Sequence, residues 1–376
     1  MDGPEPMPDD LLSAITETAR VELYKTLLRI DNGVRMAVNG GLYEFEPEPS
    51  DVMIDERHIL LRRYRSKREG GPIHPVPVLI IPPLMVKPDI YDLRPGHSFV
   101  EFMLNEGYDV WLVDFGRPNE EDRDFRLEDY LMQPINSSVE KMRKVTGSPQ
   151  VSIFGYCMGG IFATVYAALE RTEAVRNVVM LGAPIDFSKL EFYHQLMKYA
   201  EGPLVSITER FGYFPAFMSQ TLFQLTQPVK MITRPISLVW NLWDDEFLEG
   251  YEAMGKWMSD FLHYPEAAFK QFARDFVRDN RLIRNQVVMF DRVVDLSKIT
   301  ADYLVLASPD DHFGAPAAAR PIIDAIGSRE KTFMLVRGGH LGAMAGSKAP
   351  ANWKLIAEWL AERSAIGALP AAEAAG

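Results

Sequence analysis

Short apolar runs of strand length alternate with helical patterns in this chain, and this alternation constrains the fold more than any other feature. The apolar runs lie at residues 59–64, 76–81, 109–115, 150–154 and 175–181. Residues with helical spacing separate the last four runs, at 97–106, 127–146 and 161–170. Strands that alternate with helices form a parallel sheet with helices on both faces. The sequence therefore predicts an α/β fold with a mostly parallel sheet.

A long segment interrupts this alternation. Residues 188–282 contain no clear strand and are rich in Phe, Trp, Tyr and Met. They are predicted to form helices with loops at Gly202, Pro215, Pro228 and Pro235. We expect this segment to be a largely helical cap insertion over the active site rather than an independent domain.

The strand pattern returns after the insertion. Strands are predicted at residues 303–307 and 331–336, and a final helix at 353–362. The two halves of the pattern together predict one core, made of residues 51–187 and 283–364.

The two ends of the chain carry different signals. In the N-terminal helical segment, residues 1–50, apolar residues recur at helical spacing from 9 to 38 and predict one or two amphipathic helices. We expect them to pack on the main domain, with partner binding as the alternative. The first residues lack the positive charge and apolar core of a signal peptide. The C-terminal residues 365–376 are small and simple in composition, and we expect a disordered tail.

Composition argues against several classes of partner and cofactor. The formal net charge is −12 and no basic run is present, so we expect no nucleic-acid partner. No apolar run reaches the ~18 residues of a transmembrane segment. One cysteine cannot form an internal disulfide, and without a histidine cluster a zinc site is not expected. These features favour a cytoplasmic protein with no metal and no cofactor.

The single cysteine, Cys157, lies in a segment with a specific chemical meaning. Residues 155–159 read Gly-Tyr-Cys-Met-Gly, after an apolar strand and before an apolar helix. This is the cysteine form of the G-x-S-x-G nucleophile elbow, whose glycines permit a tight, strained turn. The N-terminus of the following helix stabilises a thiolate. We predict that Cys157 is a nucleophile; a small cysteine packed beside glycines is the alternative.

Two loops supply the remaining members of a catalytic triad. The order in this fold is nucleophile, acid and histidine. Asp310, Asp311 and His312 follow the first strand after the insertion, and His340 lies in a glycine-rich loop after the next strand. We predict that His340 is the base and that Asp311 or Asp310 orients it, with His312 in a supporting position.

An oxyanion hole needs two backbone N–H groups near the nucleophile. The N–H of Met158, directly after the elbow cysteine, is expected to supply the first. The second is expected from the loop at residues 82–86, where Val86 is our candidate.

Several motifs together resemble the polyhydroxyalkanoate synthase family, in particular the short catalytic subunit of its two-component, class III type. The motifs are Tyr-Asp-Leu-Arg-Pro-Gly at 91–96, Asp-Val-Trp-Leu-Val-Asp-Phe-Gly at 109–116, Gly-Tyr-Cys-Met-Gly-Gly at 155–160, Trp-Asn at 240–241, Phe-Leu at 247–248, Lys-Trp at 256–257, Asn-Arg-Leu at 280–282, Val-Asp-Leu at 294–296, Asp-His at 311–312 and Gly-His at 339–340. The resemblance runs from about residue 55 to 364. One departure follows the Asp-His pair, where Phe313, Gly314 and Ala315 precede a single Pro316 instead of a proline pair or Pro-Trp.

The resemblance implies an α/β-hydrolase fold with a triad of Cys157, Asp311 and His340, in which the acid directly precedes a histidine. It implies (R)-3-hydroxyacyl-CoA substrates, polymerised into a growing polyester chain with release of CoA. It also implies a second, non-catalytic synthase subunit, a homodimer, and a location at the surface of polyester granules in the cytoplasm.

A cysteine suits this reaction because transfer from the CoA thioester to an enzyme thioester is nearly isoenergetic. The acyl group then stays activated for transfer to an alcohol, provided that water is excluded. We expect an apolar surface for this purpose from five aromatic residues of the cap, with core packing as the alternative. They are Trp240, Trp243, Phe247, Tyr251 and Trp257.

Two other functions remain open. A cysteine-nucleophile hydrolase, of the thioesterase or dienelactone hydrolase kind, would release free acid instead of polymer. A non-catalytic granule-associated protein of the same fold would release no CoA at all.

Overall fold

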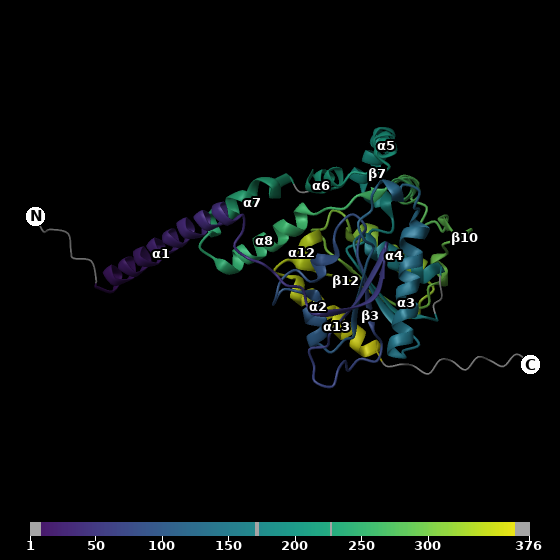
Figure 1. The fold of residues 1–376 in the computed structure, drawn as a ribbon, viewed down its shortest axis with the longest axis horizontal. Helices are drawn as coiled ribbons and strands as arrows, with labels where there is room; N and C mark the ends of the chain where they lie inside the picture. Colours follow the sequence, from purple (N-terminus) through teal and green to yellow (C-terminus); the bar gives the residue numbers. More distant parts are fainter. Residues whose placement is uncertain (1–8, 170–172, 226–227, 365–376) are drawn as a thin grey trace, which may run out of the picture.

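The core of the protein is a central sheet with helices around it (Figure 1). The sheet has eight strands in the order β1-β2-β4-β3-β5-β6-β11-β12. The computed structural model describes residues 9–169, 173–225 and 228–364, so the predicted tail at 365–376 lies outside the described residues. The strands of this sheet are β1 (Ser50–Glu56), β2 (Ile59–Tyr64), β3 (Val78–Ile81), β4 (Val110–Asp114), β5 (Val151–Tyr156), β6 (Val175–Leu181), β11 (Asp302–Ala307) and β12 (Lys331–Leu335). From β4 to β12 every neighbouring pair is parallel, which confirms the predicted mostly parallel sheet.

The sheet begins with a strand that the sequence pattern did not reveal. Strand β1 pairs antiparallel with β2, and β2 pairs antiparallel with β4. Most β1 side chains are exposed or half-buried, so the strand shows little of the apolar signal that marked the others. Its place at the edge of the sheet explains this composition.

Helices cover both faces of the sheet. Helices α3 (Gln133–Thr146) and α4 (Met158–Leu169) pack in the apolar cluster on one face. Helices α2 (Phe99–Asn105), α12 (His340–Ala345) and α13 (Ala349–Arg363) pack in the cluster on the other. Short turns of helix, α10 (Pro316–Ala319) and α11 (Ile322–Ala325), lie between β11 and β12.

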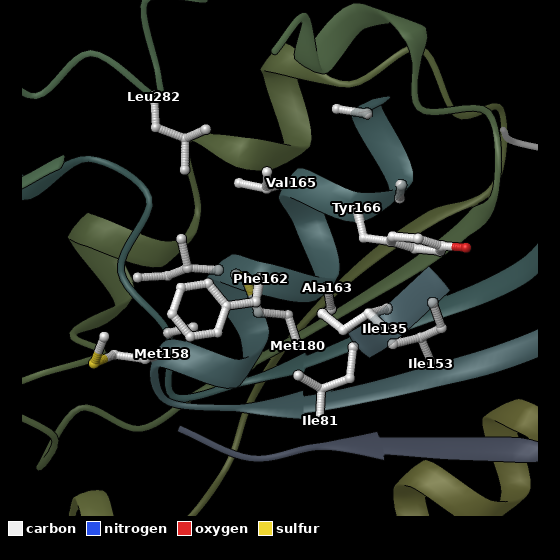
Figure 2. Packing of buried hydrophobic residues seen from close by; sticks show 14 of the residues in the cluster. Ile81, Ile135, Ile153, Met158, Phe162, Ala163, Val165, Tyr166, Met180 and Leu282 are labelled. Atoms are coloured by element: carbon white, nitrogen blue, oxygen red, sulfur yellow. The ribbon is translucent and has the colours of Figure 1, made fainter. Parts of the chain in front are cut away.

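Helix α4 lies at the centre of the larger cluster. All of its residues are buried, which is why its sequence is apolar around the whole helix rather than along one stripe. Figure 2 shows Met158, Phe162 and Val165 of this helix among side chains from the neighbouring strands and loops. This packing fixes the first turn of α4, and with it the residue that precedes the helix.

The insertion between β6 and β11 is largely helical, as predicted. Its helices are α5 (Glu191–Phe211), α6 (Ala216–Leu225), α7 (Pro228–Asn241), α8 (Asp245–Ser259) and α9 (Glu266–Gln271), followed by a π-helical turn, η5 (Phe272–Arg278). Two short strands, β7 (Tyr213–Phe214) and β8 (Tyr264–Pro265), also pair within it, although the sequence showed no strand there. A second short pair, β9 (Val288–Met289) and β10 (Arg292–Val293), follows the insertion.

The loops predicted at Gly202 and Pro235 are wrong. Helix α5 continues through Gly202 and the adjacent Pro203, and α7 continues through Pro235. A proline inside a helix removes one backbone donor and bends the helix, but it ends the helix only where no other contact holds the two halves together.

The N-terminal helix does not pack on the main domain as expected. Helix α1 (Asp9–Asn39) extends away from the body of the molecule, with its C-terminal end beside α7 (Figure 1). Leu23 and Ile30 are 62% and 60% exposed, so the apolar side chains whose spacing predicted the helix are not buried against the main domain. The contacts of α1 with the rest of the chain are concentrated toward its C-terminal end, where the Asn32 side chain donates to the Leu242 carbonyl at 2.8 Å. Within the described residues, no helix combines the length and hydropathy needed to span a membrane.

Candidate active site

Cys157 lies on the turn between β5 and α4, in a backbone conformation that non-glycine residues rarely adopt. Its φ angle is 57°, in the left-handed region, and its N–H donates to the Leu181 carbonyl of the adjacent strand at 3.0 Å. A non-glycine residue is held in this conformation at a cost of about 1–3 kcal/mol, typically where function needs it. The turn therefore has the geometry of a nucleophile elbow.

The glycines beside Cys157 are required by close backbone contacts. A Cβ atom on Gly155 would collide with the carbonyl of Gly159, and one on Gly159 would collide with the carbonyl of Ile81 at the end of β3. The elbow thus packs directly on the neighbouring strand without any side chain between them.

We expect Gly159→Ala to lower the free energy of unfolding by about 1–3 kcal/mol, because either β3 or the elbow must move. Gly202→Ala is the matched control, since a Cβ there has no atom within 4 Å and lies in a helix. That control is expected to be neutral or stabilising by up to about 1 kcal/mol. Urea unfolding measures both, and equal stabilities for the two variants would contradict the prediction.

The acid and the histidine of the predicted triad meet at the carboxyl end of the sheet. The Nδ1 atom of His340 lies 2.8 Å from Oδ2 of Asp311. His340 is 5% exposed and Asp311 is 2% exposed. Asp310 and His312, by contrast, are both exposed, so the structure brings Asp311 to the histidine and leaves these two at the surface.

The departure from the family pattern after the Asp-His pair does not disturb this arrangement. Oδ1 of Asp311 accepts hydrogen bonds from the backbone N–H of Phe313 at 2.7 Å and of Gly314 at 2.9 Å. The loop therefore holds one carboxylate oxygen with its own backbone and leaves the other for His340.

Two aromatic rings fix the orientation of His340. The rings of Tyr156 and Phe313 lie 4.9 Å and 4.8 Å from the imidazole, measured between ring centroids. The Tyr156 hydroxyl also donates to the His340 carbonyl at 3.0 Å. Since Tyr156 directly precedes Cys157, the turn that carries the predicted nucleophile also holds the predicted base in place.

The charges around His340 favour its protonated form. Burial alone would lower the pKa of His340, but the charges of Cys157 and Asp311, and hydrogen bonds with both, raise that pKa to about 10. Burial raises the pKa of Asp311, yet the charge and hydrogen bond of His340 and the two backbone donors outweigh burial and hold that pKa below 3.8. His340 thus pairs with Asp311 and is influenced by the charge of Cys157.

A cavity of about 270 Å³ opens beside Cys157 and His340. The cap forms most of its wall, and nearly all of the lining is apolar. The side chains that line it include Met85, Met197, Phe223, Phe261, Phe269 and Phe272. A thioester carbonyl at Cys157 would therefore lie at the edge of a water-poor chamber.

The cap aromatics predicted from the sequence are mostly in other places. Trp257 lines the cavity, but Trp240 is 67% exposed, and Phe247 stacks on Tyr251 at a centroid distance of 6.0 Å, away from the cavity lining. The ammonium group of Lys25 on α1 lies over the Trp243 ring, 4.3 Å from its centroid. The lining comes instead from other aromatic residues of the cap, a signal that we did not use. They are Tyr193, Phe214, Phe223, Phe261, Tyr264, Phe269 and Phe272.

The two backbone groups predicted for an oxyanion hole belong to residues beside Cys157 and its cavity. Met158 is the first residue of α4, and Val86 lines the same cavity as Cys157. Val86 forms an isolated antiparallel bridge with Phe261, which ties this loop to the cap. Pro82 and Pro83 have no N–H, so the second donor must come from later in the loop.

Comparison with known proteins places this geometry in a family. Residues 95–346 match the family model of the alpha/beta hydrolase fold. The chain is 31% identical over 325 residues to the poly(3-hydroxyalkanoate) polymerase subunit PhaC of Haloferax mediterranei, which covers 85% of this chain and 65% of the relative. The PhaC subunit of Haloarcula marismortui is 31% identical over 327 residues, covering 84% of this chain and 68% of the relative. That of Allochromatium vinosum is 28% identical over 339 residues, covering 89% and 94%.

The chain thus spans 65% of the length of the first of these relatives and almost all of the third. The resemblance inferred from the motifs is confirmed by sequence similarity over most of the chain. The family model and these relatives show that the chain belongs to the α/β hydrolase fold and to the family of the poly(3-hydroxyalkanoate) polymerase subunits PhaC.

Proposed function

We propose that the protein polymerises (R)-3-hydroxyacyl-CoA into a polyester, with Cys157, His340 and Asp311 as its catalytic triad. The observation that carries the proposal is the contact of Asp311 with His340 at 2.8 Å, beside an elbow cysteine at the edge of an apolar cavity. Family membership supplies the reaction class, and the cavity supplies a place for an acyl chain.

In the first step the acyl group moves from CoA to the enzyme. The proton of the Cys157 thiol lies on His340 before the reaction begins, and the sulfur attacks the thioester carbonyl. The tetrahedral intermediate carries its negative charge on oxygen, which the N–H groups of Met158 and Val86 stabilise. The C–S bond to CoA then breaks, the sulfur of CoA receives the proton from His340, and the acyl group remains on Cys157.

In the second step the chain grows by one ester bond. The hydroxyl of another 3-hydroxyacyl group attacks the acyl thioester, and His340 accepts the hydroxyl proton. The bond between carbonyl carbon and Cys157 sulfur breaks, and the proton passes to that sulfur. Asp311 stabilises the imidazolium in both steps and holds its Nδ1 proton.

The apolar cavity favours polymerisation over hydrolysis. Water would compete with the hydroxyl for the acyl thioester, and walls that offer few hydrogen bonds disfavour water. We assign the role of a cap to residues 188–282 for this reason, since they supply most of the lining.

The proposal is tested by incubating the protein with 3-hydroxybutyryl-CoA, following CoA release and analysing the product. Polymer is the expected product. Free 3-hydroxybutyrate in amounts equal to the CoA released would identify a cysteine hydrolase instead. No CoA release, with no labelling of Cys157 by iodoacetamide, would identify a non-catalytic protein of the same fold.

We also propose that the protein acts in the cytoplasm at granule surfaces, as a homodimer and with a second, non-catalytic subunit. The family of PhaC subunits supports this, because the relatives are named as subunits of a polymerase. Assays with and without a co-encoded subunit, combined with light scattering, test it. An unchanged rate and a monomer under both conditions would refute the proposal.

We expect Asp311→Asn to lower the rate of CoA release by about 10²–10⁴-fold, because an amide can neither hold the correct tautomer nor stabilise the imidazolium. Asp310→Asn is the matched control and is expected to leave the rate within about twofold, since Asp310 is exposed. Equal losses in the two variants would refute the role of Asp311.

The same variant has a predictable effect on stability at high pH. The raised pKa of His340 contributes stability that is fully present below 6.5 and is lost as the pH rises through about 10. Asp311→Asn removes one cause of this raised pKa, so the loss still begins near pH 6.5 but ends at lower pH and is smaller in total. Thermal unfolding between pH 7 and pH 11 measures this shift.

A further inference from the structure

Two residues of the cavity wall carry hydroxyl groups that have no hydrogen-bond partner among the described residues. They are Oγ of Ser219 and the phenol oxygen of Tyr264, and both residues line the cavity beside Cys157. Ser219 is 3% exposed and Tyr264 is 1% exposed. A buried hydroxyl without a partner costs about 1–3 kcal/mol. Two such groups in one apolar cavity therefore need an explanation.

Neither hydroxyl is needed to hold its own residue in place. The Ser219 backbone N–H donates to the Pro215 carbonyl at 3.2 Å, and Tyr264 pairs with Phe214 between β8 and β7. The Tyr264 ring also packs edge-on against Phe269, with centroids 5.8 Å apart. Backbone pairing and ring packing position both residues, and the hydroxyls add nothing to either.

The serine differs from its neighbour on the same helix. The Thr221 hydroxyl donates to the Phe217 carbonyl at 2.7 Å, which is the usual bond of a helical hydroxyl to the preceding turn. Ser219 does not make the corresponding bond, although it lines the cavity and its hydroxyl has no other partner among the described residues. Burial raises the pKa of Tyr264 well above 10.0, so its hydroxyl stays protonated and can donate.

The chemistry of these walls fits an acyl chain that carries oxygen. A plain alkyl chain would fill the apolar space but leave both donors unsatisfied. A 3-hydroxyacyl chain, or a polyester built from it, is largely hydrocarbon yet carries an oxygen atom beyond the thioester on every unit. Such a chain can satisfy isolated donors without bringing water into the cavity.

We propose that the hydroxyls of Ser219 and Tyr264 donate hydrogen bonds to oxygen atoms of the acyl chain carried by Cys157, and so select oxygen-bearing acyl groups over plain ones. This rests on the proposed acylation of Cys157. It assigns to the cap a role in recognition of the substrate as well as in the exclusion of water.

Ser219→Ala and Tyr264→Phe test this, since each removes one hydroxyl and little else. The measured quantity is the rate of Cys157 acylation, followed by intact-protein mass spectrometry, with 3-hydroxybutyryl-CoA and with butyryl-CoA. Each variant is expected to slow acylation by the hydroxyacyl substrate about three- to tenfold and to leave the butyryl rate unchanged. Tyr213→Phe is the matched control, because Tyr213 is not among the residues of the cavity wall and should change neither rate.

Stability separates a binding role from a structural one. Removing an unpartnered buried hydroxyl should leave the melting temperature unchanged or higher. Equal slowing with both substrates, or no slowing with either, would overturn the inference while leaving the acylation of Cys157 intact. If the unmodified protein is not acylated by 3-hydroxybutyryl-CoA, the proposed function itself fails.

Discussion

Cys157→Ala is expected to lower CoA release from 3-hydroxybutyryl-CoA by at least about 10³-fold, and to abolish polymer formation. The variant removes the sulfur that attacks the thioester and leaves the oxyanion hole and the cavity in place. Alanine keeps a Cβ atom in the same backbone conformation, so the strain at φ 57° and the fold are unchanged. Released CoA is measured with a thiol reagent, and circular dichroism and thermal unfolding report on the fold.

The composition of the chain makes this experiment unusually clean. Cys157 is the single cysteine in the sequence, so iodoacetamide labels one side chain and an acyl adduct found by mass spectrometry has one possible sulfur. An adduct on Cys157→Ala, or CoA release within tenfold of the unmodified protein, would show that another group carries the acyl chain.

Cys157→Ser tests whether the reaction needs sulfur or only a nucleophilic side chain at this position. Serine keeps the hydrogen-bonding geometry toward His340 but holds the acyl group as an oxygen ester, which lies lower in free energy than a thioester. Transfer to a second hydroxyl is then no longer favoured. We expect slow acylation without polymer, and polymer at the normal rate would contradict the argument for sulfur.

The parts of the fold that the sequence predicted are those whose signals are local. The elbow glycines lie within a few residues of Cys157, and the buried strands are continuous apolar runs. Strand β1 gave no such signal, because an edge strand with exposed side chains is defined by its partner rather than by its own composition. Helix α1 gave a helical signal but no information on what it contacts, and its apolar residues are largely exposed.

In the candidate site, too, features with a local signal could be predicted and features that depend on distant parts of the chain could not. His340 could be predicted from a glycine-rich loop after a strand, whereas the choice between Asp310 and Asp311 could not be made from neighbouring residues alone. The structure distinguishes them because the backbone N–H groups of Phe313 and Gly314 hold one carboxylate and not the other. The cavity lining was missed for a related reason: rings such as Phe261, Tyr264 and Phe269 line the cavity beside Cys157 only because the cap folds over it.

His340→Gln is expected to lower CoA release by about 10³-fold or more, since glutamine can fill part of the space of imidazole but cannot accept and return a proton. In the unmodified protein the pKa of His340 is raised to about 10, so the imidazolium beside Cys157 persists across the neutral range. The thiolate is the reactive form of a cysteine, and a nearby cation favours it. Alkylation of Cys157 by iodoacetamide at pH 7 should therefore slow by about tenfold or more in the variant.

The pH dependence of alkylation distinguishes a lost base from a damaged fold. A thiol without a neighbouring cation ionises near pH 8.5, so above this pH the thiolate forms without the help of His340. The alkylation rates of His340→Gln and the unmodified protein should accordingly converge above about pH 9.5. His312→Gln is the matched control, because His312 is exposed and should alter neither the rate at pH 7 nor the pH profile. A deficit in His340→Gln that persists unchanged at high pH would mean that the substitution blocks access to Cys157 and that His340 is not its base.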